Sequence, residues 1–394
     1  MNRPALLTAP LLLFLLVTFI APIGAFLWRG VTDTEVAPVL PRTVAALADW
    51  NGQSTPEEPA FAALVADLRA ARDHDRDTGA GSIPRAAARL NADYPGFRGL
   101  LPMTARRVAA PFEGSARDTL LAISEEWRAP ETWGAIRRAG GPLSSFHLLT
   151  ALDLRQDAAG HIAPVPDNQA VFRAVLLRSL WISLTVTACC LLLGWPIAWL
   201  IATAQGWKAT VLLAAVMLPF WISLIVRTAA WMVLLQREGI VNAALEAVGV
   251  PGAPLPLIMN RFAVVLAMVH ILLPFMVLPL VAAFRALDPR LPRAAASLGA
   301  APWRVFLRVT LPLCLPGVGA GCILVFIQAL GFYVTPALLG GPNDQMLAWF
   351  VGFYATRSVN WGLAAALSMM LLVAVGLCVA LYGRLAGFRR PGAA

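Results

Sequence analysis

Few residues in this sequence could carry out chemistry, and they do not form a reactive set. The four histidines, His74, His147, His161 and His270, share no metal-ligand spacing. No serine or cysteine stands in a nucleophile elbow of the form G-x-S-x-G. The single lysine, Lys208, lies in "TAQGWKAT", which lacks the glycine spacing of a phosphate-binding loop. We therefore predict no catalytic residue, no bound metal or cofactor, and no ATP hydrolysis by a P-loop of this chain.

The cysteines do not suggest redox chemistry either. None of the five lies between residues 30 and 170, which excludes a disulfide framework in that region. All five lie in or beside apolar stretches, where a cysteine acts as a small hydrophobic side chain. They are Cys189, Cys190, Cys314, Cys322 and Cys378.

The composition is that of a chain largely embedded in lipid. Of the 394 residues, 59% are hydrophobic and 13% are charged, whereas soluble domains carry about 25% charged residues. A helix needs roughly 20 apolar residues to cross a bilayer. Six stretches meet this requirement and predict six transmembrane helices: Pro4–Trp28, Ser179–Gln205, Ala209–Leu235, Phe262–Phe284, Val318–Leu339 and Val359–Leu381.

The first of these stretches has two interpretations, a cleaved secretory signal or an uncleaved membrane anchor. Its uncharged run is much longer than the roughly 7–15 apolar residues of a signal peptide. This length favours the anchor, so we assign residues 1–29 to an N-terminal transmembrane helix.

Residues 30–170, here called the 30–170 block, are polar and separate the first two apolar stretches. The block holds 18 of the 22 acidic residues and 14 of the 31 basic ones. The spacing of one helical face is followed by four apolar residues, Phe61, Leu64, Val65 and Leu68. Thr119–Arg138 gives a weaker helical pattern. We predict that the block is a mostly helical insertion.

Lysine and arginine collect in loops that stay in the cytoplasm. Outside the block, basic residues gather at residues 1–3, at Lys208, between residues 285 and 308, and between residues 384 and 390, whereas the opposite loops carry a few bases mixed with acids. We therefore predict a multi-pass membrane protein, with both termini cytoplasmic and the 30–170 block outside. This topology explains the basic balance of the chain, so no nucleic-acid partner is predicted.

The segment between residues 285 and 317 has the features of a rigid knob at the membrane surface. Asp288 can cap a helix N-terminus. A short helix over Arg293–Leu298 should follow, and Gly299 can adopt the left-handed conformation that ends a helix. These residues predict a helix that stops at a defined turn.

A second short helix should begin at Pro302, which suits a first helical turn. Pro312 and Pro316 are expected to bend the chain into the next span. The physical pattern alone allows two roles for this knob. It could insert into a groove on a partner, or it could lie at the membrane interface as an amphipathic linker.

Polar and aromatic residues interrupt the third and fifth spans. An arginine within a span should face a water-filled cavity or a pairing partner, and irregular backbone at membrane depth is tolerated where it is buried or lines a cavity. We predict that six residues line a translocation path: Phe220, Trp221, Ser223, Arg227, Tyr333 and Thr335. A structural brace between helices is an equal alternative for Arg227. His270, also within a span, could act in the path or bond a carbonyl of a neighbouring helix.

The stretch from "RAAASLGA" to "LPLCLPG" resembles the EAA motif of the permease subunits of ATP-binding cassette (ABC) importers. The matching residues are Ala294, Ala295, Leu298, Gly299, Ala300, Leu311, Pro312, Pro316 and Gly317. In that family the loop forms a coupling helix that docks into the ATPase subunit. The resemblance implies an ATPase-coupling role for Asp288, Arg293, Ala294, Ala295, Leu298, Gly299, Ala300 and Pro302.

The sequence departs from the motif at two positions. Arg293 stands where the family usually has a glutamate, and Pro292 stands where a second acid is common. An acidic contact to the ATPase is therefore lost, or the groove of the partner has changed to suit this chain.

Three longer stretches resemble the spermidine/putrescine (polyamine) branch of these permeases. They are "LPFWISLIVRTAAWMVLLQREGIVN" (Leu218–Asn242), "LDPRLPRAAASLGAAPWRVFLRVTLP" (Leu287–Pro312) and "GFYVTPALLGGPNDQMLAWFVGFY" (Gly331–Tyr354). The resemblance covers residues 175–385. The 30–170 block is longer than the external loop expected in that branch.

The resemblance implies an all-α polytopic protein of the bacterial plasma (inner) membrane with the type I ABC importer permease fold and six transmembrane helices. The expected divisions are the N-terminal helix (1–29), the external, periplasmic block (30–170), a five-helix permease core (171–386) with its coupling loop (285–317), and a cytoplasmic tail (387–394).

The expected function is a permease subunit, not an enzyme, that conducts a small organic solute, with a polyamine favoured. The implied partners are a second permease subunit, two cytoplasmic ATP-binding subunits, a periplasmic solute-binding protein and membrane lipid. Two alternatives stay open. The first is another substrate, such as an amino-acid derivative or an opine. The second is a membrane sensor whose external block binds a ligand.

Overall fold

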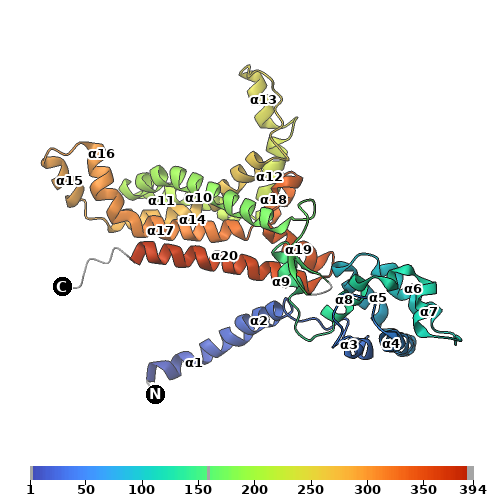
Figure 1. Ribbon diagram of the computed structural model, residues 1–394. Helices are drawn as coiled ribbons and strands as arrows, with labels where there is room; N and C mark the ends of the chain where they lie inside the picture. Colours follow the sequence, from blue (N-terminus) through green and yellow to red (C-terminus); the bar gives the residue numbers. More distant parts are fainter. Residues whose placement is uncertain (1–2, 158–159, 388–394) are drawn as a thin grey trace. The chain divides into compact units, whose positions relative to one another are not determined.

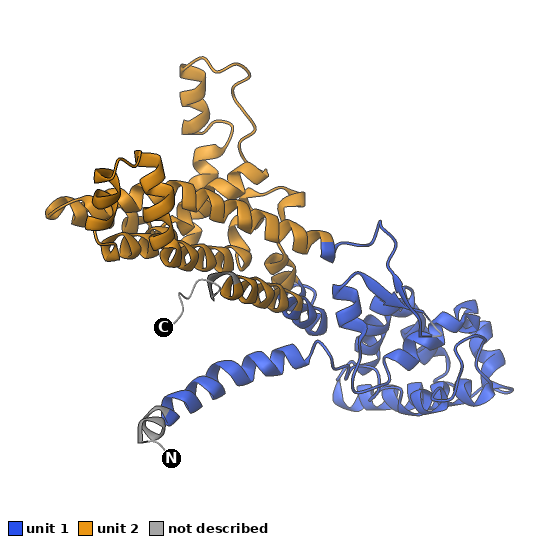
Figure 2. Cartoon of the chain, turned by 60° about the vertical axis from the view of Figure 1, so that its left-hand side comes forward, with its two compact units in different colours: residues 1–173, 354–369 blue, residues 174–353, 370–394 orange. Residues whose placement is uncertain are grey.

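The computed structural model describes residues 3–157 and 160–387, and it is built almost entirely of helices (Figure 1). The chain divides into two compact units (Figure 2). The first unit comprises residues 1–173 and 354–369, and the second comprises residues 174–353 and 370–394. The predicted cytoplasmic tail from residue 388 onward, with Arg389 and Arg390, lies outside the described residues.

Within the described residues, five helical segments are long and apolar enough to cross a membrane: Ala9–Trp28, Phe172–Thr203, Arg261–Ala286, Pro302–Leu330 and Trp361–Arg384. The first comprises α1 (Arg3–Leu15), a π-helical turn (Leu16–Ile20) and α2 (Ala21–Trp28). The others are α10 (Phe172–Thr203), α14 (Arg261–Ala286), α20 (Trp361–Gly387), and α16 (Pro302–Val305) joined through a π-helical turn to α17 (Leu311–Leu330).

A bent pair of helices could form a sixth crossing. α11 (Trp207–Met217), with a 3₁₀ turn at Leu218–Trp221, is followed by α12 (Leu224–Leu235) and α13 (Ile240–Ala247). The axis bends by 95° between Trp221 and Leu224, where Ile222 and Ser223 have extended backbone. The sequence predicted one span interrupted only by Arg227, so the position of this break is a correction.

The fifth predicted span also differs from the structure. Its helix ends at Leu330 instead of Leu339, and a separate short helix, α18 (Val334–Leu339), follows. A 3₁₀ turn (Pro342–Asp344) and α19 (Leu347–Thr356) then lead to α20. Gly331 ends the long helix, and Tyr333 leaves the helical conformation before α18 begins.

α14 forms the centre of the second unit, and α17 packs closely against it. A Cβ at Gly317 would overlap the side chain of Ala283 and come within 2.9 Å of the Pro279 carbonyl oxygen. A Cβ at Gly321 would come within 2.8 Å of the Met276 sulfur. Small residues at helix interfaces in membranes let backbones approach in this way. The two glycines, one helical turn apart, therefore fix the contact between α14 and α17.

The 30–170 block has a helical core of its own. Its elements are α3 (Pro41–Ala46), α4 (Glu58–Thr78), α5 (Ser82–Asp93), α6 (Phe97–Arg107), α7 (Ala116–Ile123), a 3₁₀ turn (Glu125–Arg128), α8 (Pro130–Arg138), α9 (Phe146–Ala151) and the antiparallel strands β1 (Leu154–Gln156) and β2 (Ile162–Pro164). The predicted apolar face of α4 is confirmed, because all four of its residues are buried in this core.

Two fully buried indoles organise that core. Trp127 donates its indole N–H to the Thr104 hydroxyl at 3.0 Å, and Trp133 donates to the Trp127 carbonyl at 2.8 Å. The Phe61 and Trp133 rings meet with centroids 4.6 Å apart. The predicted helical run over Thr119–Arg138 is broken into three pieces here, because Ser124 is extended and the chain re-enters a helix at Pro130.

His147, on α9, is a buried titratable group in the block. Its side chain packs on the backbone of Gly362, where an added Cβ would overlap the imidazole ring. Burial, reinforced by the cation of Arg89, lowers the pKa of His147 from 6.5 to about 3. The imidazole therefore stays neutral in the folded protein across the physiological pH range.

This burial makes the stability of the block depend on pH. The unfolded chain takes up a proton on His147 below about pH 6.5, whereas the folded protein does not until about pH 3. The free energy of unfolding should therefore fall as the pH drops, by about 2 kcal/mol from pH 7 to pH 5. Glutamine cannot take up a proton at this position. We therefore expect the free energy of unfolding of His147→Gln to lack this fall between pH 7 and pH 5. Thermal unfolding of both proteins at the two pH values measures the difference, and parallel curves would contradict the prediction.

Candidate functional site

The coupling segment between residues 285 and 317 is a helix–turn–helix at one end of the second unit, opposite the end that holds α12 and α18 (Figure 1). α15 (Arg290–Ser297) begins after Asp288, whose carboxylate accepts the Arg290 backbone N–H at 2.9 Å. The Asp288 carboxylate thus lies at the helix start as predicted, but the N-cap residue is Pro289. Pro289 precedes the first helical residue, and Pro292 lies in the first turn, where no backbone donor is needed.

Gly299 ends α15 in the conformation that the sequence predicted. Its φ is +82°, its N–H bonds the Ala296 carbonyl at 3.0 Å, and the Ala300 N–H bonds the Ala295 carbonyl at 3.2 Å. This pair of bonds is a Schellman motif, which satisfies helix-end carbonyls and favours glycine at the left-handed position. Nothing lies within 4 Å of a Cβ built at Gly299, so the requirement for glycine within this chain comes from the backbone conformation.

The turn presents an apolar tip. Leu298 is 89% exposed and Trp303 is 60% exposed. The predicted coupling residues Arg293, Ala294 and Pro302 are also exposed, and Ala295 and Ala300 are half-buried. The structure therefore gathers the predicted set on one small knob, and its largest exposed side chain next to the glycine is Leu298.

The knob is held by residues that the sequence reasoning did not single out. Trp195, on α10, makes edge contacts with Phe284 at 4.9 Å and with Phe306 at 5.3 Å between ring centroids. Phe284 lies at the end of α14, and Phe306 begins the π-helical turn (Phe306–Thr310). One indole thus ties both arms of the segment to the bundle. Aromatic residues beside the knob were the only signal in the sequence, and nothing in it shows that they meet.

Pro312 and Pro316, where the sequence predicted a bend, lie inside a continuous helical segment. The second helix of the knob runs without interruption from Pro302 to Leu330. The wide π-helical turn precedes Pro312, where the Leu311 N–H bonds the Phe306 carbonyl. Pro312 lies in the first turn of α17, where a missing N–H is tolerated. Pro312 and Pro316 therefore lie within the helical segment and do not divide it.

A polar cluster lies where α12, α14 and α18 meet, at the other end of the unit. The hydroxyls of Thr228 and Thr335 are 3.2 Å apart, and Trp231 donates its indole N–H to Nδ1 of His270 at 3.1 Å. The partner of His270 is thus a side chain and not the predicted helix carbonyl. Thr335 is fully buried, so its hydroxyl links α18 to α12 within this chain.

The other candidate path residues lie on the surface of this chain. Trp221 is 87% exposed, and Phe220, Ser223 and Tyr333 are exposed as well. Arg227 is half-buried, and its Nε and Nη1 atoms have no hydrogen-bond partner among the described residues. A cation inside a span without a partner in its own chain needs water or a group from another molecule. The break at Ile222–Ser223 lies beside it, where irregular backbone also needs a cavity or protein cover.

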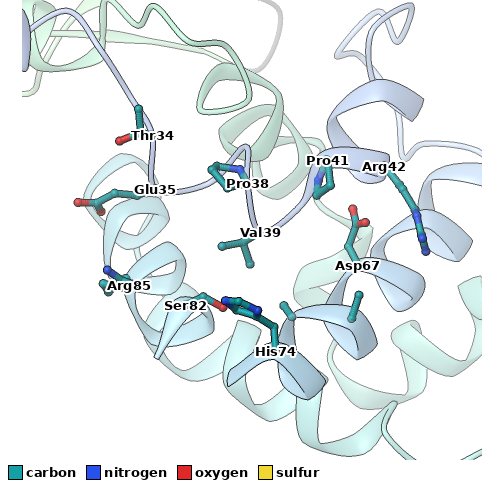
Figure 3. Close-up of a pocket in the computed structure, with 12 residues that line it drawn as sticks. Thr34, Glu35, Pro38, Val39, Pro41, Arg42, Asp67, His74, Ser82 and Arg85 are labelled. Carbon is teal, nitrogen blue, oxygen red and sulfur yellow. The ribbon is translucent and has the colours of Figure 1, made fainter. Parts of the chain in front are cut away.

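The 30–170 block contains a cavity of about 560 Å³ between α3, α4 and α5 (Figure 3). Its lining carries charges of both signs from Glu35, Arg42, Asp67 and Arg85, and it includes His74. Asp67 is buried and already accepts both the backbone N–H and the hydroxyl of Thr43 at 2.8 Å. The carboxylate of Asp67 therefore holds the start of α3 in place, and the cavity has no concentration of one charge.

Comparison with known proteins identifies the membrane half. A family model described as "Binding-protein-dependent transport system inner membrane component" matches residues 254–386. The spermidine/putrescine transport system permease protein PotB of Escherichia coli (strain K12) is 35% identical over 210 residues, which cover 53% of this chain and 76% of PotB. PotB of Haemophilus influenzae is 36% identical over 214 residues, covering 54% of this chain and 75% of that protein. This chain belongs to the family of binding-protein-dependent transport system inner membrane components.

The chain is thus a permease subunit of an ABC importer, a multi-pass protein of the inner membrane, and not an enzyme. The fold class expected from the sequence, an all-α polytopic permease, is confirmed. These relatives favour transport over a membrane sensor. A bacterial alginate ABC transporter solved in complex with its alginate-bound periplasmic protein is a more distant structural match, with 19% identity and a TM-score of 0.45 over 56% of this chain and 78% of that one.

Proposed function

We propose that this permease forms one half of the translocation path for a polyamine. The PotB relatives, which are named for spermidine and putrescine transport, support this substrate class. The proposed partners are a second permease subunit, two cytoplasmic ATP-binding subunits and a periplasmic solute-binding protein. ATP binding and hydrolysis on the partners would alternate the access of the path.

The observation that carries the proposal is the coupling segment. Its Schellman turn at Gly299 projects Leu298 from a knob that Trp195 braces. An exposed leucine at a rigid tip suits insertion into an apolar groove, which is how we propose the ATP-binding subunit is engaged. Arg293 beside the tip would meet an acidic or neutral rim on that subunit, in place of the contact that a glutamate makes.

The path residues support a shared pathway. Phe220, Trp221 and Tyr333 expose aromatic rings, and aromatic faces attract ammonium groups. Arg227, however, repels a polycation, and the membrane half of this chain has four acidic residues only, Glu238, Glu246, Asp288 and Asp344. We propose that the second permease subunit supplies carboxylates to the path, one of them facing Arg227.

Uptake in membrane vesicles that contain the assembled transporter tests this function. We expect labelled spermidine or putrescine to accumulate with ATP and the solute-binding protein, and not when this permease is omitted. An excess of unlabelled polyamine should compete, whereas an amino-acid derivative should not. If only the amino-acid derivative competed, the substrate would be an amino-acid derivative and not a polyamine.

The proposed topology places both termini in the cytoplasm and the 30–170 block outside. The basic residues near the two termini and in the coupling segment motivate this orientation. We expect reporter fusions after residues 100 and 390 to show opposite sides of the membrane, using alkaline phosphatase for the outside and a fluorescent protein for the inside. Activity of the same reporter at both sites would contradict the six-span arrangement.

A further inference from the structure

The first compact unit contains more than the 30–170 block. It also includes the N-terminal span, the first residues of α10 and the first turns of α20 (Figure 2). Each of these span ends is bound to the block, or to another span end in the unit, by its own buried contacts.

The link to α10 is a buried carboxylate. Asp153 is 3% exposed and accepts the backbone N–H groups of Val171, Phe172 and Arg173 at 3.0, 2.9 and 2.7 Å. These groups belong to the start of α10, where the first N–H groups lack helical partners and the helix dipole favours an anion. Asp153 itself has a φ of +53°, so the backbone is held in an uncommon conformation to present this carboxylate.

The link to the N-terminal span is a buried ion pair. Asp33 follows that span by a few residues, and its carboxylate lies 2.7 Å from Nε of Arg89 on α5, with both side chains almost fully buried. The Arg89 guanidinium also lies over the Phe146 ring, 3.9 Å from its centroid. Breaking one partner of a buried pair leaves an uncompensated charge, so the chain after the first span is firmly attached to the block.

The link to α20 is a close backbone contact. The His147 ring occupies the space that a Cβ at Gly362 would need. The end of the first span reaches the next turn of α20, because a Cβ at Gly30 would come within 3.0 Å of the Ala366 nitrogen. Arg29 lies over the Trp361 ring at 5.7 Å.

From these contacts we propose that the 30–170 block is a clamp: it holds the adjoining ends of the first span, α10 and α20 together as one body throughout transport. Asp153 is its positioning residue for α10. α10 and α20 continue from the clamp into the second unit. A force that the solute-binding protein exerts on the block therefore reaches two spans of the permease core directly. This second step rests on the proposed function.

A reversible covalent lock tests whether the clamp stays closed. In a functional background without the five native cysteines, His147→Cys and Gly362→Cys are combined, because removing the imidazole makes room for a side chain at position 362. We expect the pair to form a disulfide and uptake by the oxidised transporter to stay within twofold of the reduced one. A tenfold fall on oxidation, reversed by a reductant, would overturn the proposal. Failure to cross-link in the folded protein would contradict the contact.

Changes at Asp153 test whether the clamp transmits the signal. Asp153→Gly removes the carboxylate and tolerates the positive φ, whereas Asp153→Asn keeps one acceptor oxygen and also tolerates it. In the assembled transporter we expect Asp153→Gly to keep the basal ATPase rate and to lose at least fivefold of the stimulation by the loaded solute-binding protein, with Asp153→Asn between it and the parent. Asp167→Asn, which removes an exposed acid from the same block, should match the parent.

Full stimulation in Asp153→Gly would overturn the positioning role. An equal loss of basal and stimulated rates would also count against it, because that pattern reports general damage. A parent transporter without any stimulation would instead disprove the proposed function, so the two failures are distinguishable.

Discussion

Uptake should be abolished by Gly299→Val, although the permease still inserts and folds. Valine at a φ of +82° costs roughly 1–2 kcal/mol. The folded membrane protein tolerates this cost, but the residue leaves the left-handed conformation and the Schellman turn is lost. The space around the glycine is open within this chain, so the damage falls on the shape of the tip and on the seat of Leu298 in the partner. We expect pull-down of the ATP-binding subunit to be lost together with uptake, at equal permease levels.

The chain offers a matched control for this change. Gly249 ends α13 with a φ of +77°, through the same pair of bonds, from Gly249 N–H to the Glu246 carbonyl and from Val250 N–H to the Leu245 carbonyl, and nothing lies near a Cβ built there. Gly249→Val should carry the same backbone cost and leave the ATP-binding subunit bound. Loss of pull-down in both variants, or in neither, would show that the turn at Gly299 is not the docking element.

Trp133→Ala should unfold the 30–170 block and stop uptake by a different route. The side chain is fully buried, makes an edge contact with the Phe61 ring and donates to the Trp127 carbonyl. Truncating a buried tryptophan costs about 3–5 kcal/mol, and the Trp127 carbonyl would lose its partner. We expect rapid proteolysis of the block from the outer face, while the ATP-binding subunit remains bound at the coupling segment.

Trp207→Ala is the control, since Trp207 is 72% exposed at the start of α11 and its loss removes the same side chain without touching the block. A protease-resistant block in Trp133→Ala would contradict the assigned core. Retained uptake with a degraded block would contradict the requirement for the block in transport. The Gly299 and Trp133 variants together should separate docking of the ATP-binding subunit from the function of the block.

Local signals in the sequence predicted the elements whose structure is local. The i, i+3, i+4, i+7 face of α4 is buried as expected, because helical periodicity alone determines which side chains share a face. The end of α15 at Gly299 was also predictable, since a left-handed residue after a helix follows from glycine and its neighbours.

The tertiary features were not predictable, for physical reasons. The pairing of Thr228 with Thr335 and of Trp231 with His270 joins helices that are far apart in sequence, and no spacing rule connects them. The break at Ile222–Ser223 lies in an apolar run. The apolar composition indicates that this segment is embedded in the membrane, but it does not indicate the backbone conformation. The Asp153 carboxylate gave no signal either, because its role depends on a helix start brought to it by the fold.

The continuous helical segment from Pro302 to Leu330 connects the knob at one end of the second unit to the polar cluster at the other. With 29 residues and a rise of 1.5 Å per residue, the rod is about 43 Å long, and it carries Trp303 at one end and leads within a few residues to Thr335 at the other. A tilt imposed on the knob by the ATP-binding subunit would swing the far end, where α18 meets α12. Register matters as much as length, since one inserted residue would rotate that end by about 100°.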